Sequence, residues 1–222
     1  MYKDNFRYLL LALVLYLVIV PALKGWLVIP RSYLPPISFI FLLSIGVWSL
    51  RSSVRVFRIA MALAIVGIAL KVASAGLHMP LFDYLSTLAL FLFLLLAIWS
   101  SFRQVMFGGE MNSNRIYGAI CVYLLLGVAW SLVYGALHTA NPGAFSGAIL
   151  GNTEDPSGQW LYYSFVTLTT LGYGDILPIS PGARALAYAE AVFGVFYMAT
   201  LVAMLVGAYA AQMQKRDEAD GK

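Results

Sequence analysis

The residues with the clearest chemical potential form one stretch, Thr167 to Asp175, in which glycines alternate with residues that carry side chains. A cation that has lost its water needs a cage of oxygen atoms. Backbone carbonyls can supply that cage only if successive residues turn their C=O groups to one side. An L-residue resists the left-handed backbone that this requires, whereas glycine adopts it at little steric cost. Because Gly172 and Gly174 stand two residues apart, this stretch can turn its carbonyls to one face and its side chains to the other.

The string from Thr170 to Gly174 reads TLGYG and differs only at Leu171 from TVGYG, the loop that lines potassium-selective pores. The residue at that place contributes its carbonyl, so we expect the extra methylene to alter packing behind the loop more than ion selectivity. A chance Gly-Tyr-Gly in a surface loop is the alternative, and the apolar segments on both sides disfavour it. The predicted K+ sites are Thr170, Leu171, Gly172 and Tyr173, with Gly174 and Asp175 at the filter mouth.

Composition indicates an integral membrane protein. Of the 222 residues, 61% are hydrophobic and 11% are charged, whereas about a quarter of the residues of soluble domains are charged. The net charge is +4, and no basic patch with interleaved aromatic residues suggests a nucleic-acid partner.

The sequence does not indicate an enzyme. Cys121 is the single cysteine, which excludes an intrachain disulfide and a cysteine-based zinc site. His78 and His138 are too isolated in the sequence to form a metal site. We find no Ser/His/Asp set, paired carboxylates or phosphate-binding loop. We therefore expect K+ as the permeant ion and no enzymatic cofactor.

Six apolar runs have the roughly 17 to 25 residues that a membrane helix requires. They cover Tyr8 to Leu27, Leu34 to Leu50, Val54 to Leu77, Leu81 to Phe102, Ile116 to Leu137 and Ala183 to Gln212. No small-residue cleavage site follows the first run, which predicts a retained span. The segment between the last two runs is too polar and too rich in glycine to span, and it contains the TLGYG string.

A short helix is predicted directly before that string. Asp155 followed by Pro156 is typical of a helix start. A helix from Pro156 or Ser157 to about Thr169 is too short to cross a bilayer, so it would enter the membrane and stop there. Its carbonyl end carries about half a negative charge, which would offset part of the cost of a cation in the bilayer interior.

Positive charge predicts the orientation of the spans. Most basic residues lie before the first run, between the second and third, between the fourth and fifth, and after the sixth, whereas Lys24, Arg31 and Arg184 lie on the other side. Both termini are therefore expected in the cytoplasm of a plasma membrane, with a prokaryotic inner membrane favoured. Arg51, Arg55 and Arg58 are interpreted as an inside anchor with possible anionic-lipid contacts. A displaced voltage sensor is the alternative for these three arginines.

An ordinary voltage sensor is not expected. Moving one charge through the field yields only about 2.3 kcal/mol per 100 mV, so a sensor needs several basic residues on one helix. The fourth run, from Leu81 to Ser101, has no Arg or Lys. Lys71, His78 and Asp83 lie near the outer surface, where they are expected to stay hydrated, with a proton sensor as the alternative.

From Trp160 to the end of the sixth run, the chain resembles the potassium channel pore superfamily, in particular prokaryotic six-helix members with a GYGD-type filter and a short tail. The resemblance implies an all-α membrane protein: six transmembrane helices, with a re-entrant pore helix and filter loop between helices five and six. It also implies a fourfold homotetramer, because one chain supplies a quarter of each carbonyl ring. The expected parts are a front domain like a voltage-sensor fold without gating charges (1–107), a linker (108–115), a pore domain (116–213) and a cytoplasmic tail (214–222). No soluble ligand-binding domain is expected.

The same resemblance implies roles around the filter. Tyr162 would steady Asp175, and Tyr163 would brace Tyr173 in an aromatic cuff. Val166 stands where some relatives carry a Glu that pairs with the Asp after the filter. That carboxyl pair cannot form here.

Two features of the sixth run leave alternatives open. Gly194 falls where the family often has a bending glycine, and Gly207 offers a second flexible point. Close approach of a neighbouring helix is the alternative at Gly194. Glu190 is costly in lipid, so it should face protein or water. Arg184 or a polar group behind the filter is its expected partner, and lining of the cavity is the alternative.

Together these features predict a potassium-selective channel that conducts K+ passively and is not voltage-gated by ordinary charge movement. The first alternative is the pore subunit of a potassium uptake transporter. Such pores usually place four degenerate filter loops in one long chain, whereas this chain has one well-formed loop. The second alternative is a non-conducting subunit that modifies other channels.

Overall fold

The computed structural model describes residues 5–19, 21, 54–77, 79–107, 113–147 and 156–220. These residues are mostly helical, which confirms the predicted helical fold class. The elements are α1 (Asn5–Val14), η1 (Leu15–Ile19, a π-helical segment), α4 (Val54–Leu77), α5 (Pro80–Phe107), α6 (Ser113–Ala140), η4 (Pro142–Ala144), β1 (Phe145–Ser146), α7 (Pro156–Leu168), β2 (Leu177–Pro178) and α8 (Pro181–Asp220). The two short strands pair antiparallel, with Phe145 opposite Pro178.

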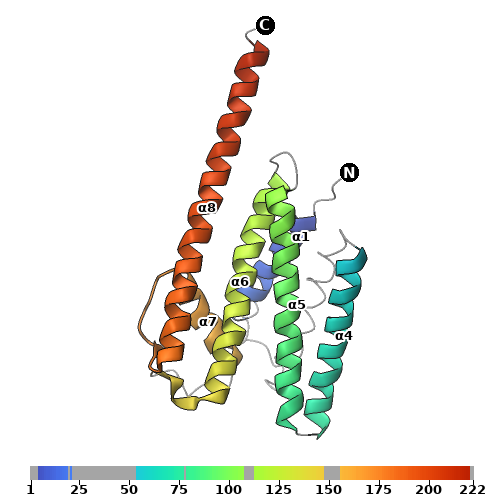
Figure 1. Cartoon of the computed structure of the whole chain (residues 1–222), viewed down its shortest axis with the longest axis vertical. Coiled ribbons are helices and arrows are strands. Elements are labelled where there is room, and N and C mark those ends of the chain that lie inside the picture. Colours follow the sequence, from blue (N-terminus) through green and yellow to red (C-terminus); the bar gives the residue numbers. More distant parts are fainter. Residues whose placement is uncertain are drawn as a thin grey trace.

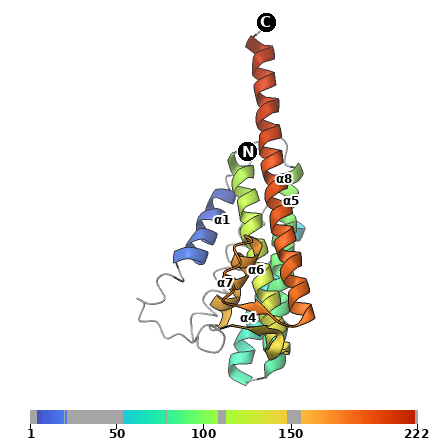
Figure 2. The same ribbon diagram turned by 90° about the vertical axis from the view of Figure 1, so that its left-hand side faces the viewer.

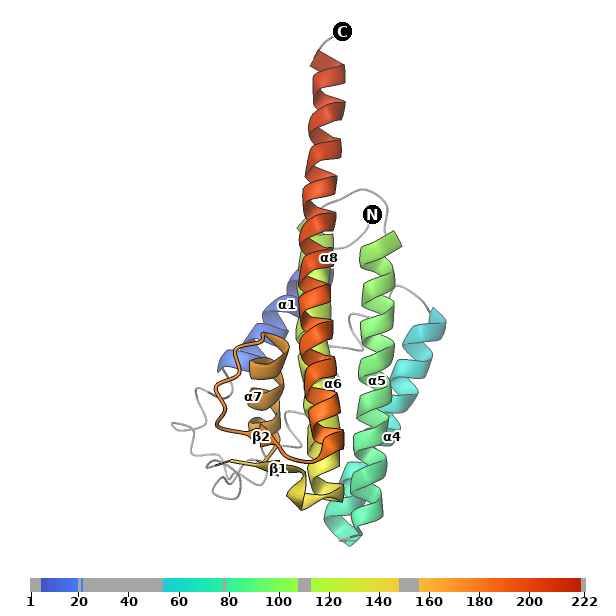
Figure 3. The ribbon, with the colours of Figure 1, turned by 60° about the vertical axis from the view of Figure 1, so that its left-hand side comes forward.

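The helices form two connected groups around α6. On one side α4 and α5 run side by side, and α5 packs against α6 (Figure 1). On the other side the short helix α7 packs between α6 and α8, and the C-terminal half of α8 extends well beyond the other helices. Helix α1 also packs along α6, as the turned view shows (Figure 2). The strand pair lies near the base of α7 (Figure 3). Helix α6 is therefore the element that both groups share.

Helix bounds agree with the apolar runs in the middle of each helix and differ at the ends. Helix α4 covers the predicted run, and α7 begins at the predicted Pro156 and ends at Leu168. Helices α5, α6 and α8 extend beyond their apolar runs because polar residues at a membrane surface still favour helix. In α8 the helix continues through Asp220, across most of the predicted tail, since residues 213–220 contain neither Gly nor Pro.

In the described part of the chain, three helices are long and apolar enough to cross a membrane. They are Leu81–Phe107, Ser113–Ala140 and Pro181–Ala211. Of the first predicted run, the described residues form a shorter apolar helix, Phe6–Val18. The run Leu34 to Leu50 lies outside the described residues, as do Arg51, His78, Asp155 and the side chain of Arg55.

The larger apolar core joins the front helices to α6. Its buried members come from α1, α4, α5 and α6, including Leu9, Ala60, Phe93 and Leu125. Arg115 at the start of α6 adds a polar contact, because its guanidinium donates to the carbonyl of Val105 near the end of α5, with a distance of 2.8 Å from Nε. Free carbonyls at a helix end favour such a cationic partner. Helices α5 and α6 are thus held together at both apolar and polar positions.

An ion pair that the sequence did not predict joins α4 to α5. The Lys71 Nζ lies 2.7 Å from Asp83 Oδ1, and the two side chains are 37% and 53% exposed. Pairs of this exposure contribute at most about 1 kcal/mol. The pair therefore adds little to the stability of the fold and reports how α4 and α5 are rotated against each other.

Helix α1 approaches α6 closely at Gly118. A Cβ on Gly118 would lie 2.9 Å from both Phe6 Cδ2 and Val105 Cγ2. The Phe6 N–H donates to Asn114 Oδ1 at 3.2 Å, and Cys121 Sγ lies 3.7 Å from the Phe6 carbonyl oxygen. The missing side chain at Gly118 is what lets Phe6 enter the space between α5 and α6.

Gly118→Val is expected to loosen α1, because the new side chain would meet Phe6 and Val105. Overpacking of this kind costs about 1–3 kcal/mol. The measurement is the rate at which a thiol reagent labels buried Cys121, the sole cysteine, in detergent-solubilised protein. Gly76→Val on α4 is the matched control, since a Cβ there meets nothing within 4 Å. Equal labelling rates in the two variants would contradict the proposed approach of α1.

Candidate functional site

The backbone φ angles of residues 170–174 alternate in sign. Thr170, Gly172 and Gly174 have φ of 59°, 59° and 77°, whereas Leu171 and Tyr173 between them do not have positive φ. Alternation of left-handed and right-handed residues turns successive carbonyls toward one side, as the spacing of the glycines predicts. The described segment therefore has the backbone geometry needed for a row of oxygen atoms.

Hydrogen bonds to α7 fix which side the carbonyls face. The N–H groups of Leu171 and Gly172 both donate to the Val166 carbonyl oxygen, at 2.9 and 3.2 Å. The Thr170 N–H donates to the Thr167 carbonyl oxygen at 2.9 Å. Because the C=O of a trans peptide points opposite to the N–H of the same unit, the carbonyls of Thr169, Thr170 and Leu171 face away from the end of α7.

Thr170 has a backbone conformation that the sequence analysis missed. A residue other than Gly at positive φ is uncommon, and the conformation costs about 1–3 kcal/mol unless its surroundings impose it. Here the Thr170 N–H bond to Thr167 and the next two N–H bonds to Val166 impose it. Extending the two-residue spacing of Gly172 and Gly174 back by one step would have identified it.

Helix α7 directs its carbonyl end at this segment. The helix ends at Leu168, and the Thr169 hydroxyl donates to the Phe165 carbonyl oxygen at 2.6 Å. The Tyr123 hydroxyl of α6 lies 3.3 Å from the Leu168 carbonyl oxygen. The negative end of the helix dipole therefore lies directly next to the row of oxygen atoms.

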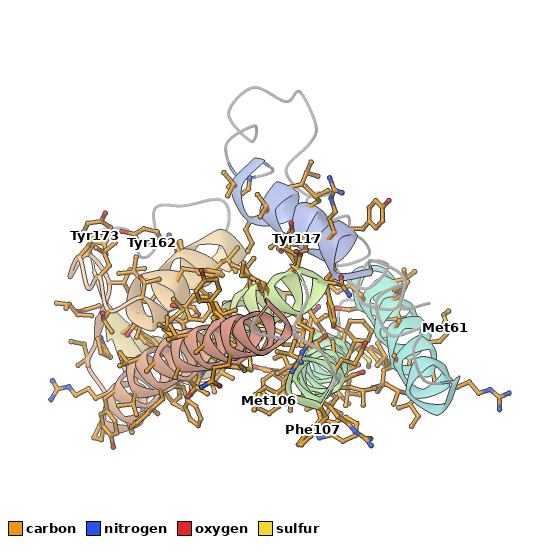
Figure 4. The ribbon with its side chains drawn as sticks, turned by 90° about the horizontal axis from the view of Figure 1, so that it is seen from above. Met61, Met106, Phe107, Tyr117, Tyr162 and Tyr173 are labelled. Atoms are coloured by element: carbon orange, nitrogen blue, oxygen red, sulfur yellow. The ribbon has the colours of Figure 1, made fainter. Side chains whose placement is uncertain are left out.

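Asp175 and Tyr162 form the outer end of the segment. The Tyr162 hydroxyl donates to Asp175 Oδ2 at 2.5 Å, and the Ile176 N–H donates to Oδ1 at 3.1 Å. Figure 4 shows Tyr162 and Tyr173 together at one edge of the molecule. The backbone of Gly147 lies so close behind that a Cβ there would be 2.1 Å from the Asp175 carbonyl oxygen. The Tyr162 hydroxyl and the backbone of Gly147 thus both lie against Asp175.

Tyr163 belongs to a buried aromatic cluster behind the segment. Its ring lies 4.8 Å from Tyr134, 5.5 Å from Phe145 and 6.3 Å from Trp160, centre to centre. All four rings are at most 5% exposed. Edge-to-face contacts of this kind stabilise beyond simple burial. Within one chain the cluster fixes α7 against α6; the bracing of Tyr173 by Tyr163 that the resemblance implies stays a prediction.

Helix α8 approaches the end of α7 at Gly194. A Cβ on Gly194 would lie 2.1 Å from the Leu168 carbonyl oxygen, whereas a Cβ on Gly207 would meet nothing within 4 Å. The Tyr197 hydroxyl, one turn further along α8, donates to the Ala119 carbonyl oxygen at 2.6 Å. Helix α8 is continuous through both glycines. The close approach that the sequence left open is therefore present at Gly194, and the role of either glycine as a hinge stays a prediction.

Glu190 faces protein and is completely buried. The Tyr134 hydroxyl donates to its Oε2 at 2.6 Å, and Ser164 Oγ lies 2.5 Å from its Oε1. Of the two partners expected, the polar group behind the filter is the one found. Arg184 instead donates from Nε to the Pro178 carbonyl oxygen at 3.2 Å.

One long face of α8 is apolar and exposed in the single chain. Only 6% of its membrane-length apolar window is buried. Its exposed large side chains are Tyr188, Val192, Phe193, Val195, Phe196, Met198, Val202, Val206 and Tyr209. Among the described residues, no group of three or more His, Cys, Asp or Glu side chains could hold a metal ion.

Three comparisons with known proteins bear on this site. Residues 118–211 match a family described as "Ion channel". Over 97 residues the chain is 36% identical to "Two pore potassium channel b" of Oryza sativa subsp. japonica, which covers 43% of this chain and 24% of that protein. It is 34% identical over 87 residues to "Two pore potassium channel c" of the same organism, and 31% identical over 87 residues to "Two-pore potassium channel 5" of Arabidopsis thaliana. Each of these two matches covers 39% of this chain, and they cover 17% and 19% of the relatives.

No solved structure matches the chain significantly. The chain spans about a quarter or less of the length of the relatives it matches. The matched family and relatives are channels, which are not enzymes, so the prediction of a non-enzyme is confirmed. The apolar helices and the family match support a membrane protein with a role in ion transport. Residues 118–211 are thus similar to an ion channel family, and the three plant relatives named above are potassium channels.

Proposed function

We propose that the chain is the subunit of a potassium-selective channel that conducts K+ passively down its electrochemical gradient. The observation that carries the proposal is the alternating hand of the TLGYGD backbone, with its N–H groups bonded to the end of α7. That arrangement leaves the carbonyls of Thr170, Leu171, Gly172 and Tyr173 free to replace the water of an ion. The names of the plant relatives agree with K+ as the ion.

Four chains are needed to complete the ion sites. One chain supplies one row of carbonyls, and an ion that has lost its water must be surrounded. The exposed apolar face of α8 provides the surface that neighbouring copies and lipid would cover. A fourfold homotetramer around the rows of carbonyls brings four α7 carbonyl ends toward one axis, and their partial negative charges favour a cation.

The remaining parts follow the sequence analysis. The proposed protein has six spans, with the filter loop re-entering between the fifth and sixth, both termini in the cytoplasm, and a prokaryotic inner membrane as its location. Arg51, Arg55 and Arg58 would contact anionic lipid at the inner surface. Because residues 81–101 of α5 carry no Arg or Lys, opening does not depend on charge movement of the ordinary voltage-sensing kind.

The main test compares Gly172 in the loop after α7 with Gly182 in the first turn of α8. A Cβ would meet nothing within 4 Å at either Gly172 or Gly182, but only Gly172 has positive φ, at +59°. Gly172→Ala is therefore expected to distort the carbonyl row, at about 1–2 kcal/mol per chain, and to abolish potassium flux or its preference over sodium. Gly182→Ala should conduct as wild type. The measurement is ion flux into liposomes that contain only the purified protein.

The same flux measurement distinguishes the channel from the uptake transporter and from the modulatory subunit. Flux without nucleotide or a partner supports the channel, whereas flux that requires either supports an uptake transporter. Silence alone with current on co-expression with another channel supports a modulatory subunit. An unchanged preference for K+ over Na+ in Gly172→Ala would refute the assignment of the filter.

The assembly should contain four copies of the 24.3 kDa chain. Native mass spectrometry of the detergent-solubilised protein measures this directly. A monomer or dimer as the largest species in mild detergent would count against a pore built from four carbonyl rows.

The two glycines of α8 are expected to respond differently to alanine. Gly194→Ala should lower the thermal unfolding midpoint, because its Cβ would collide with the Leu168 carbonyl oxygen. Gly207→Ala should leave the midpoint unchanged or raise stability by up to about 1 kcal/mol, since alanine favours helix. Tryptophan fluorescence on heating provides the measurement. If Gly194 served only as a hinge, its alanine variant would unfold at the wild-type temperature and differ only in channel opening.

A further inference from the structure

A cluster of buried polar side chains joins α6, α7 and α8 behind the filter. None of its members belongs to the filter segment itself. Glu190 on α8 and Ser164 on α7 are both 0% exposed. Tyr134 on α6 lies 2.6 Å from Glu190 Oε2, and Ser164 Oγ lies 2.5 Å from Oε1. Ser164 Oγ also lies 2.7 Å from the Gly127 carbonyl oxygen on α6. The carboxyl group thus contacts both helices that hold the filter in place.

Counting hydrogens decides the charge of this carboxyl group. The cluster has three short oxygen–oxygen contacts, and each needs one hydrogen. The hydroxyls of Tyr134 and Ser164 supply one hydrogen each. With an ionised Glu190, Ser164 would have to donate to two acceptors with one hydrogen, and one contact would set lone pairs against each other. A protonated Glu190 supplies the third: it donates from Oε1 to Ser164, Ser164 donates to Gly127, and Tyr134 donates to Oε2.

The surroundings also disfavour a charge. The titratable groups that face Glu190 are phenols: Tyr123 and Tyr134 from α6, and Tyr163 from α7. Among the described residues the ion pair found is Lys71 with Asp83, on other helices. A fully buried carboxylate with no cation loses more by desolvation than two hydrogen bonds return.

We propose that Glu190 is held as a neutral carboxylic acid and acts as a positioning residue, whose proton keeps α8 locked to α6 and α7 behind the filter. The role in conduction rests on the proposed channel function. Ser164 precedes Val166 by two residues, and the Val166 carbonyl accepts the N–H groups of Leu171 and Gly172. A shift of Ser164 therefore moves the group that orients the carbonyl row.

Two substitutions test whether the Glu190 side chain acts as a neutral group. Glu190→Gln keeps all three contacts, because its amide can donate to Ser164 and accept from Tyr134. Glu190→Ala removes both contacts to the carboxyl group. In liposomes, Glu190→Gln should conduct as wild type, and Glu190→Ala should show about tenfold lower potassium flux, the size of a typical coupling between sites. Wild-type flux should fall as alkaline pH ionises Glu190, and the flux of Glu190→Gln should not. Both proteins retain the three tyrosines, so their difference reports Glu190 alone.

Infrared spectroscopy tests the proton without any conduction. The carbonyl band of a protonated carboxylic acid should appear in wild type and vanish in Glu190→Gln. Tyr134→Phe should move that band to higher frequency, because Tyr134 donates to the carbonyl oxygen Oε2. The measurement uses the purified, detergent-solubilised protein at neutral pH.

The outcomes distinguish this inference from the proposed function. The band together with wild-type flux in Glu190→Gln supports the inference. An absent band overturns it even in a conducting protein. A present band with flux as low in Glu190→Gln as in Glu190→Ala overturns the positioning role. If every variant and the wild type fail to conduct while the band and its shift are present, the channel function fails and the protonated cluster stands.

Discussion

The structure depends on which acceptors bond to the N–H groups of residues 170–172 in the TLGYGD segment. In a membrane every backbone polar group must be satisfied, because no water is available to replace a missing bond. Here the N–H groups of residues 170–172 donate to carbonyls in the last turn of α7. Those bonds use the donors of residues 170–172 and turn the carbonyls of the same peptide units away from α7. The backbone can be irregular only because the end of a helix supplies the acceptors.

Because the TLGYGD segment bonds to the end of α7, its conformation depends on a well-ordered α7. A helix of 13 residues is too short to be stable by itself. It is held by the ring cluster around Tyr163, by Ser164 and by the close approach of Gly194 to Leu168. Bulky apolar side chains fill α1, α5 and α6, where contact is needed but orientation matters less.

The sequence predicted the features that depend on local pattern. Apolar runs identified the middle of the longer described helices, the Asp155–Pro156 pair identified the start of α7, and the glycine spacing identified the left-handed positions Gly172 and Gly174. Helix ends were less predictable, because polar residues beyond the apolar run can continue the helix, as they do in α8.

Contacts between distant residues were largely beyond prediction. Lys71 and Asp83 could be placed near one surface, but their pairing depends on how α4 and α5 rotate against each other. For Glu190 the cost of lipid exposure predicted a polar partner. Which one, Ser164 or Arg184, depended on the path of the chain after the filter. The resemblance supplied Tyr162 with Asp175, since that pair follows from motif positions and not from physical reasoning about one sequence.

A polar contact between α7 and α8 does something that an apolar contact at the same place would not. Apolar surfaces attract without direction, so two helices can slide by an ångström and lose little. A hydrogen bond near 2.5 Å weakens steeply with distance and angle. The three oxygen contacts around Ser164 and Glu190 therefore admit one register of α8 against α6 and α7. The carbonyl of Val166 lies on the same helix as Ser164. A change in the register of α8 would therefore also change the orientation of the carbonyl row. This is the physical reason for placing a carboxyl group where leucine would bury more apolar surface.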